Sequence, residues 1–253
     1  MKDELTLAHL NLHAVLPLLE EVVEFDSEAA RIVKGWNYSI RFAVSGGPMT
    51  FLQFGNGKLK VERGKGAFPS VGFWFTSPQK LNLMFAGKGM PILWTGFWNI
   101  GVLKGFPALA KRLEYYMRPT DEMLKDKEVF DLYIKLSLYA MTSGIKAVGE
   151  NDPEIKPLMA KTRSGAVQFE VMPDGPAAYV SLCNGRLEAG KGRIEKPNCF
   201  MKFKNSEILC QLIKGELDAF AALARCDITI SGFIPLVDTF NAALDRVGVY
   251  LGG

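Results

Sequence analysis

The stretch that decides the fold occurs twice, as GPMTFLQFGNGKL at residues 47–59 and as GPAAYVSLCNGRL at residues 175–187. Both copies place an Asn-Gly pair between two apolar runs, at Asn56-Gly57 and at Asn184-Gly185. Asn-Gly is the strongest short hairpin signal, because both residues tolerate the positive φ of a tight turn. Each copy therefore predicts two antiparallel strands joined by a two-residue turn.

The similarity between the two copies extends beyond the hairpin. With a shift of 128 residues, ten of the 41 positions in residues 47–87 are identical, where chance supplies about two or three. Weaker matches pair Asp26 with Asp152 upstream, and Ile100 with Ile228 and Gly105-Phe106 with Gly232-Phe233 downstream. A period this long indicates a duplicated domain rather than a solenoid repeat. The sequence predicts a first domain at residues 1–118 and a second at 119–253.

Both halves follow the same order of predicted elements. Each begins with helical periodicity, which Pro17 is expected to kink or split in the first half, and then changes to the period-two alternation of strands. Later helices at 77–85 and 206–213 are stopped by Gly87 and Gly215. The second half adds a helix at 218–224, a strand at 228–230 and a closing helix at 235–247, whereas the first half ends in a helix at 107–117. The predicted class is α+β, with a mostly antiparallel sheet in each half.

Composition and charge exclude several classes of function. The net charge of +3 is small for 253 residues, and lysines and arginines are scattered among acids, so nucleic acid is not an expected partner. The start of the chain lacks the apolar core of a signal peptide, and the longest apolar stretch, residues 90–103, is too short to span a bilayer. The four cysteines show no CxxC spacing. We therefore expect a cytoplasmic protein with reduced, mostly buried thiols.

The residues that could perform catalysis are few. The only histidines, His9 and His13, share one face of the first predicted helix, but the helix supplies no obvious third metal ligand. The second half has no histidine, so it cannot build a Ser-His-Asp or Cys-His site from its own residues. None of the glycine-rich pieces has the spacing of a phosphate-binding loop. We expect no catalytic residues, no metal site, no cofactor and no enzymatic activity.

The first half is unusually apolar where the second is charged. A predicted strand at 71–75 and two predicted helical stretches at 81–85 and 90–98 hold three of the four tryptophans. At the shifted positions, the second half has Lys202 for Trp74, Asp218 for Met90 and Arg225 for Phe97. Such a surface must be covered, either by the other domain or by an apolar ligand in a cavity. The two interpretations are compatible if a pocket lies beside the domain interface.

The hairpin around Asn184-Gly185, the strand at 199–204, the helix that ends at Gly215 and the final Ile228-Thr-Ile-Ser-Gly232 phrase resemble the sterol carrier protein type 2 domain. Phe233 stands where that family often has an acid, and the first half looks like a diverged copy that retains Asn56-Gly57 and Gly87. The resemblance implies two domains, each with a five-stranded, mostly antiparallel sheet and helices on one face. We expect the two domains to pack as an internal pseudo-dimer.

The resemblance further implies a tunnel between sheet and helices for a fatty acyl chain, a sterol or another lipid. The implied ligand-binding residues are Phe73, Phe75, Met84, Phe85, Trp94, Phe97 and Trp98 in the first half, and Met201, Phe203, Leu212, Ile213, Phe220 and Leu223 in the second. The expected function is non-catalytic carriage of an apolar ligand, with transient membrane contact or self-association also open. The alternative is an accessory protein that docks a partner enzyme through the aromatic surface of the first domain, without lipid.

Overall fold

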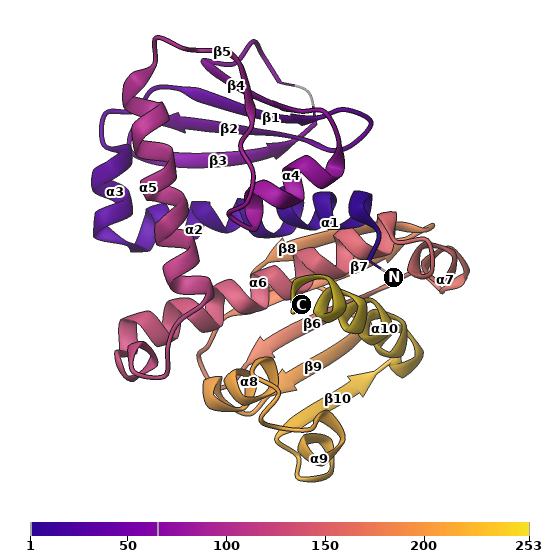
Figure 1. Cartoon of the computed structure of the whole chain (residues 1–253). Coiled ribbons are helices and arrows are strands. Elements are labelled where there is room, and N and C mark those ends of the chain that lie inside the picture. Colours follow the sequence, from indigo (N-terminus) through magenta and orange to yellow (C-terminus); the bar gives the residue numbers. More distant parts are fainter. Residues whose placement is uncertain (1, 65, 253) are drawn as a thin grey trace. The chain divides into compact units, whose positions relative to one another are not determined.

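The computed structural model describes residues 2–64 and 66–252 (Figure 1). The chain divides into two compact units, Met1–Arg118 and Pro119–Gly253. Each unit contains one five-stranded sheet with helices, which confirms the α+β class. The arrangement of the two as a pseudo-dimer stays a prediction.

The first unit begins with helices, forms its sheet and ends with a long helix. Its elements are α1 (Glu4–Leu10), a π-helical turn (Asn11–Val15), a 3-10 helix (Leu16–Leu18), α2 (Leu19–Phe25), α3 (Ser27–Val33), β1 (Ser39–Val44), β2 (Met49–Gly55), β3 (Lys58–Arg63), β4 (Val71–Phe75), α4 (Pro78–Phe85), β5 (Ile92–Thr95) and α5 (Ile100–Met117).

The second unit follows the same order with one additional helix. Its elements are a 3-10 helix (Met123–Lys125), α6 (Lys127–Asn151), α7 (Ile155–Lys161), β6 (Gly165–Val171), β7 (Ala177–Cys183), β8 (Arg186–Lys191), β9 (Cys199–Phe203), α8 (Ser206–Ile213), α9 (Ala219–Ala224), β10 (Ile228–Gly232) and α10 (Ile234–Leu251). Figure 1 shows α6 and α10 lying across this sheet.

The two sheets have the same strand order. It is β3-β2-β1-β4-β5 in the first unit and β8-β7-β6-β9-β10 in the second. The central pairs β1–β4 and β6–β9 are parallel, and the other neighbours are antiparallel. The sheets are therefore mixed, although antiparallel pairs predominate as predicted.

Both predicted hairpins are present. Asn56 and Gly57 have φ values of 54° and 71°, and Asn184 and Gly185 have φ values of 50° and 76°. Two consecutive residues with positive φ form the turn that matches the twist of the flanking strands. Gly87 and Gly215 also have positive φ, at the ends of α4 and α8, as expected for C-terminal caps.

Pro17 disrupts the first helical segment, as predicted. The chain passes from α1 through a π-helical turn and a 3-10 helix before α2 begins at Leu19. Proline has no N–H to donate to the preceding turn, and its ring crowds that turn. The corresponding α6 has no proline and runs unbroken for 25 residues.

The last part of the first unit differs from the prediction. Residues 90–98 contain the edge strand β5 rather than a helix, and α5 begins at Ile100 with Pro107 inside it. β5 pairs with β4 as β10 pairs with β9, so Gly96-Phe97, and not Gly105-Phe106, corresponds to Gly232-Phe233. The shifted comparison was wrong here because six residues connect α4 to β5, whereas fourteen, including α9, connect α8 to β10.

The core of each unit lies on one face of its sheet. In β1, Ile40, Phe42 and Val44 are buried, and their parallel partners in β4 are Val71, Phe73 and Phe75. Because paired residues point to the same side, these six side chains form one apolar face. We call this side of each sheet the inner face, because the Phe106 ring of α5 packs against it.

Candidate functional site

The first unit holds an aromatic cluster between its sheet and α5. The ring centroid of Phe42 lies 5.2 Å from that of Phe73 and 5.6 Å from that of Phe106. Phe75 stacks against Phe42 at 6.4 Å. Phe42, Phe73 and Phe75 are buried, but Phe106 is half-buried. Solvent therefore reaches this interior beside α5.

The interior of the second unit is closed beside its last helix. α5 and α10 both have 18 residues, and a shift of 134 aligns Phe106 with Phe240 and Leu103 with Val237. Phe240 and Val237 are each 1% exposed, whereas Phe106 and Leu103 are half-buried. The same position on the same helix is thus sealed in one unit and accessible in the other.

Apolar side chains of the second unit reach solvent at another place. Leu212 at the end of α8, Leu223 of α9 and Ile230 of β10 are half-buried. Ile230 pairs with Met201, so it lies on the inner face of the sheet. Leu212, Leu223 and Ile230 are thus apolar side chains of α8, α9 and β10 that are partly open to solvent.

Four of the residues expected to line a tunnel in the first half are buried or half-buried. Phe73 and Phe75 lie on the inner face, and Met84 and Phe85 are half-buried on α4. The sequence analysis missed Phe106, whose ring contacts the predicted Phe73 and also Phe42. Aligning α5 with α10 would have found it, since Phe240 occupies the same position.

Trp94 lies on the opposite, outer face of the sheet. A Cβ atom at Gly72 would overlap the Trp94 indole, and the Arg41 guanidinium lies 4.6 Å from the ring centroid. The Phe68 ring packs edge-on against Trp94 at 5.6 Å. The expectation that Trp94 shares an interior with Phe73 and Phe75 is thus corrected, because in β5 it is Leu93 that pairs with Phe73.

Phe97 and Trp98 lie in the loop between β5 and α5. Both side chains are exposed, and they therefore stand outside the aromatic cluster. They were expected to line a ligand site because residues 90–98 were predicted to be helical. In the structure this stretch leaves the edge of the sheet instead.

The six residues expected in the second half divide into three groups. Met201 and Phe203 are buried on the inner face, and Leu212 and Leu223 are half-buried. Ile213 and Phe220 are exposed. The first four are thus withdrawn from solvent wholly or in part, whereas Ile213 and Phe220 are on the surface.

A buried polar cluster of Asp, Arg and Tyr occurs once in each unit. In the second unit, the Asp152 carboxylate accepts hydrogen bonds from Arg246 at 3.0 Å and from the Tyr250 hydroxyl at 2.7 Å. It also accepts from the backbone N–H groups of Glu154 and Ile155. Asp152 is fully buried. It ties α10 to the start of α7.

The first unit repeats this cluster with fewer bonds. Asp26 accepts from the backbone N–H of Glu28 and from Arg112, and Arg112 donates to the Tyr116 hydroxyl at 3.3 Å. The shift of 134 that aligns α5 with α10 places Arg112 on Arg246 and Tyr116 on Tyr250. The sequence analysis paired Asp26 with Asp152 but missed these partners.

The environment of Asp152 favours its charged form. Burial by itself would raise the pKa of this carboxyl, but hydrogen bonds from Tyr250, from the Glu154 backbone and from Arg246 outweigh it and lower the pKa. The same ion pair raises the pKa of Arg246. The cluster thus stabilises the fold as an ionised pair.

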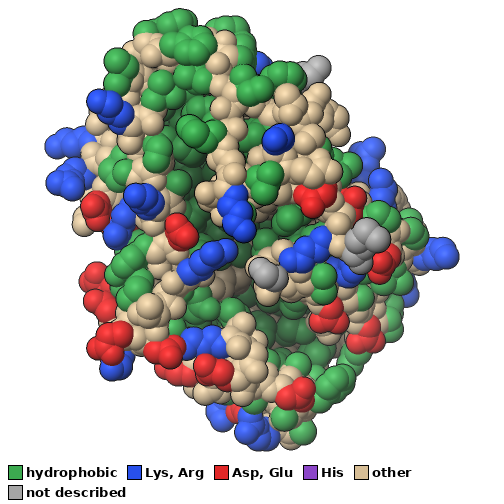
Figure 2. Space-filling model, in the orientation of Figure 1, with side chains coloured by type: hydrophobic (Ala, Val, Ile, Leu, Met, Phe, Trp, Pro, Cys, Tyr) green, Lys and Arg blue, Asp and Glu red, His purple; other side chains and the backbone are tan. Residues whose placement is uncertain are grey.

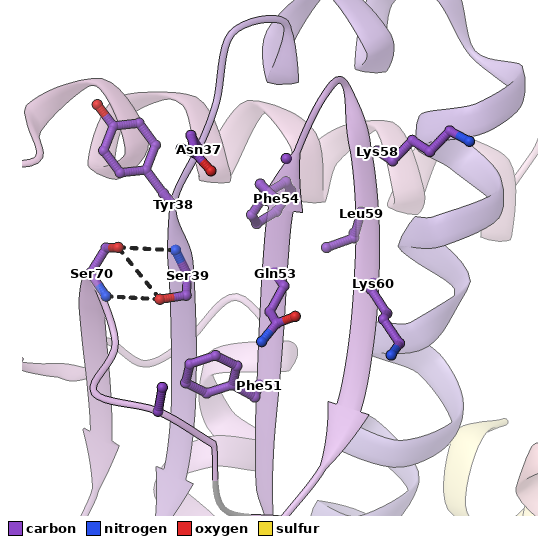
Figure 3. A pocket seen from close by; sticks show the side chains of 12 residues that line it. Asn37, Tyr38, Ser39, Phe51, Gln53, Phe54, Lys58, Leu59, Lys60 and Ser70 are labelled. Atoms are coloured by element: carbon purple, nitrogen blue, oxygen red, sulfur yellow. Dashed lines mark hydrogen bonds between the residues drawn. The ribbon is translucent and has the colours of Figure 1, made fainter.

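A hollow of about 520 Å³ lies on the outer face of the first sheet (Figure 3). Phe51 and Gln53 of β2 lie at its centre, and Lys58 and Lys60 of β3 lie at one side. The Ser39 and Ser70 side chains each accept a hydrogen bond from the other's backbone N–H. None of the predicted ligand-binding residues lines this hollow.

The two histidines contact each other. Their Nδ1 atoms are 3.3 Å apart, and His13 Nε2 lies 3.3 Å from the Met49 carbonyl oxygen. Burial, with a smaller effect of Arg63, lowers the pKa of His9 to about 4, so it is neutral at pH 7. Within residues 2–64 and 66–252, no three His, Cys, Asp or Glu side chains are grouped so that they could hold a metal ion.

Two further expectations concerned buried cysteine thiols and membrane-spanning segments. All four cysteines are free, but only Cys199 and Cys210 are buried, so the expectation of mostly buried thiols holds for half of them. Burial raises the pKa of both buried thiols. In the described part of the chain, no helix has the length and apolar character needed to cross a membrane.

The family comparison concerns the second unit. Residues 145–245 match the model of the SCP-2 sterol transfer family. The chain contains one SCP-2 sterol transfer domain. No curated protein matches the chain.

Solved structures similar to the chain include three sterol carrier proteins. Sterol Carrier Protein 2 from Yarrowia lipolytica has 17% identity and a TM-score of 0.34, and the match covers 44% of this chain and 91% of that one. Palmitated SCP2L2 from Aedes aegypti has 18% identity and a TM-score of 0.31, with 41% and 86% covered. The sterol carrier protein domain 2 of Helicoverpa armigera has 20% identity and a TM-score of 0.33, with 44% and 87% covered.

The SCP-2 domain begins within α6 and ends within α10. It therefore includes the whole sheet of the second unit and the three short helices α7, α8 and α9. All six ligand-binding residues expected in the second half lie inside it, as do Ile230 and Phe240.

Proposed function

We propose that the SCP-2 domain binds an apolar small molecule, such as a fatty acyl chain, a sterol or another lipid, without catalysing a reaction. The observation that carries the proposal is the match of residues 145–245 to the SCP-2 sterol transfer family. The half-buried apolar side chains between α8, α9 and β10 support it. In this proposal an apolar tail enters between these side chains.

Binding in this model is driven by removal of apolar surface from water. Each CH₂ group that a ligand buries contributes about 0.8 kcal/mol. Met201 and Phe203 would contact the deepest part of the ligand, and Leu212 and Leu223 would contact the part nearer the opening. Ile213 and Phe220, which are exposed at the rim, would become covered when the ligand is bound.

We further propose that the first unit is a diverged second copy of the same domain. The identical strand order and the repeated Asp–Arg–Tyr cluster support a tandem duplication. In this copy Phe73, Phe75, Met84, Phe85 and Phe106 would line the equivalent space. An internal pseudo-dimer and a cytoplasmic location complete this model.

The test is a native mass spectrum of the full chain, purified under mild conditions, compared with its denatured mass. We expect additional mass of lipid size that is lost on denaturation. Leu223→Glu places a charge among the half-buried apolar groups and should reduce the amount of bound lipid at least fivefold. Leu158→Glu is the matched control, because Leu158 is an exposed leucine on α7 of the same unit.

Two results would contradict the lipid-binding proposal. One is a bare native mass together with no uptake of added palmitate or cholesterol by the folded protein. The other is full lipid content in Leu223→Glu with an unchanged far-UV spectrum, which would remove the site between α8, α9 and β10.

A second candidate function is docking of a partner enzyme by the first unit, without lipid. The observation that favours it is the set of exposed aromatic side chains, Phe68, Trp74, Phe97 and Trp98, in that unit. A bare native mass combined with co-purification of one enzyme would favour this function over lipid binding.

A further inference from the structure

An exposed apolar surface surrounds the edge strand of the first unit. We call it the β5 patch; it consists of Trp74, Met90, Ile92, Phe97, Trp98 and Ile100. Met90 is 88% exposed and Trp98 is 72% exposed, which is unusual for side chains of this size. β5 lies at the edge of its sheet, and the chain segments on both sides of it supply the most exposed members.

The segment of sequence that contains the β5 patch carries only positive side-chain charge. Residues 63–113 contain seven lysines and arginines and no Asp or Glu. Lys88 precedes Met90 by two residues, and Lys104 follows Ile100 by one helical turn; both are exposed. Where β5 and the start of α5 lie, Figure 2 shows green hydrophobic and blue basic side chains, with no red side chain visible among the described residues.

The corresponding part of the second unit has no such imbalance. Residues 191–247 contain eight lysines and arginines and seven Asp and Glu, a net charge of +1, compared with +7 in residues 63–113. The small net charge of the whole chain therefore hides a strongly basic segment. Of its basic residues, Lys88 and Lys104 lie next to members of the β5 patch, whereas Arg112 is ion-paired with Asp26 and Glu28.

We propose that the β5 patch docks the protein on a membrane surface that carries anionic headgroups. Tryptophan and phenylalanine partition favourably into the boundary between headgroups and acyl chains. Lysines beside them are attracted to anionic lipids. The β5 patch has exposed aromatic side chains and lysines next to each other, which is the combination that binding to an anionic membrane surface needs.

The charge argues against a second copy of this chain as the occupant. A two-fold dimer through the β5 patch would bring the patch against itself, and with it the exposed Lys88 and Lys104 of both copies. A protein partner would need a surface that is both apolar and acidic. An anionic bilayer has both properties over its whole area.

The proposal goes beyond the proposed ligand site and does not depend on it. The patch lies in the first unit, and the SCP-2 domain lies in the second. If the second unit carries a lipid, docking would bring the protein to a surface where such molecules reside.

The experiment is sedimentation of the full chain with sucrose-loaded vesicles. We expect it to bind phosphatidylcholine vesicles containing 30% phosphatidylglycerol at least about tenfold more tightly than pure phosphatidylcholine vesicles, and to lose this preference in high salt. Phe97→Ser/Trp98→Ser and Lys88→Glu/Lys104→Glu should each reduce binding about tenfold. Phe25→Ser is the matched control, because Phe25 is 57% exposed and Phe97 is 59% exposed.

Three results would overturn the docking proposal. The first is equal binding to both vesicle types, and the second is wild-type binding by both folded double variants. The third is self-association or a stable protein complex that is abolished by Phe97→Ser/Trp98→Ser while vesicle binding is absent. The native mass of the same preparations separates this failure from a failure of ligand binding, because bound lipid is measured without vesicles.

Discussion

The two units have the same fold but differ in the side chains that they expose. They share the strand order, the Asn-Gly hairpin and the buried Asp–Arg–Tyr cluster that holds the last helix. They differ at the end of the sheet where β5 or β10 lies. There the second unit has the additional helix α9, and the first has a short loop and the exposed β5 patch.

This comparison separates residues that the fold requires from residues that are free to specialise. The repeated features are turns, caps and one buried ion pair, all of which satisfy backbone or buried polar groups. The differing features are side chains in loops and on the outer face, where a substitution costs little stability. Specialisation of the two units is therefore expected at the β5 and β10 ends.

Truncating the aromatic residue of the last helix should give the largest difference in stability loss between the two units. Phe240→Ala should destabilise the second unit by about 4 kcal/mol, because it leaves a cavity in a sealed core. Phe106→Ala should destabilise the first unit by about half as much, because Phe106 is only partly buried and its truncation leaves a smaller cavity. Tryptophan emission during urea unfolding reports on the first unit, because all four tryptophans lie there, and circular dichroism reports on both.

Equal losses in the two units would contradict the conclusion that α10 seals its interior more completely than α5. Leu83→Ala, which truncates an exposed leucine of α4, serves as a control for a surface substitution and should change stability by less than about 1 kcal/mol.

Removing the buried carboxylate should give the next largest effect. Asp152→Ala removes the buried carboxylate that the half-buried Arg246 guanidinium binds, and should destabilise the second unit by about 3 kcal/mol. Asp26→Ala should cost the first unit about 2 kcal/mol, because Asp26 accepts fewer hydrogen bonds. Tryptophan emission and circular dichroism during urea unfolding measure the stability loss in the two variants.

If Asp152→Ala shifted the tryptophan transition as much as the circular dichroism transition, the units would unfold as one cooperative body. If neither signal moved, the cluster would not contribute to stability, and its repetition would need another explanation.

Acidification should reveal the smallest difference. The folded state lowers the pKa of Asp152 below the ordinary value of 3.8, so the unfolded state binds the proton more readily. The contribution of this group is fully present above about pH 4 and is lost as the pH falls through the lowered pKa. Urea midpoints from circular dichroism between pH 5 and pH 2.5 should therefore fall more steeply in the wild type than in Asp152→Asn.

Parallel slopes in the two proteins would indicate that Asp152 titrates alike in the folded and unfolded states. Measurements above pH 5 provide the internal control, because the Asp152 carboxyl is ionised in both states there. It should then add nothing to the slope of the urea midpoint against pH.

Much of the fold could be predicted because its signals are local. The Asn-Gly turns, the glycine caps and the kink at Pro17 each depend on the conformational range of one or two residues. The burial of Ile40, Phe42 and Val44 followed from the period-two alternation of the strand that they form. These features need no knowledge of what packs against them.

The repeat, the hairpins and the α+β class were determined by the sequence alone, because turn chemistry and periodicity act within a few residues. Only the tertiary structure decided that Trp94 lies on the outer face, that α5 begins at Ile100, and that Arg112 and Arg246 bind the paired aspartates. The face of an edge strand depends on its pairing register, and a one-residue slip moves every side chain to the other side. An ion pair between residues about ninety positions apart exists only once the chain has folded.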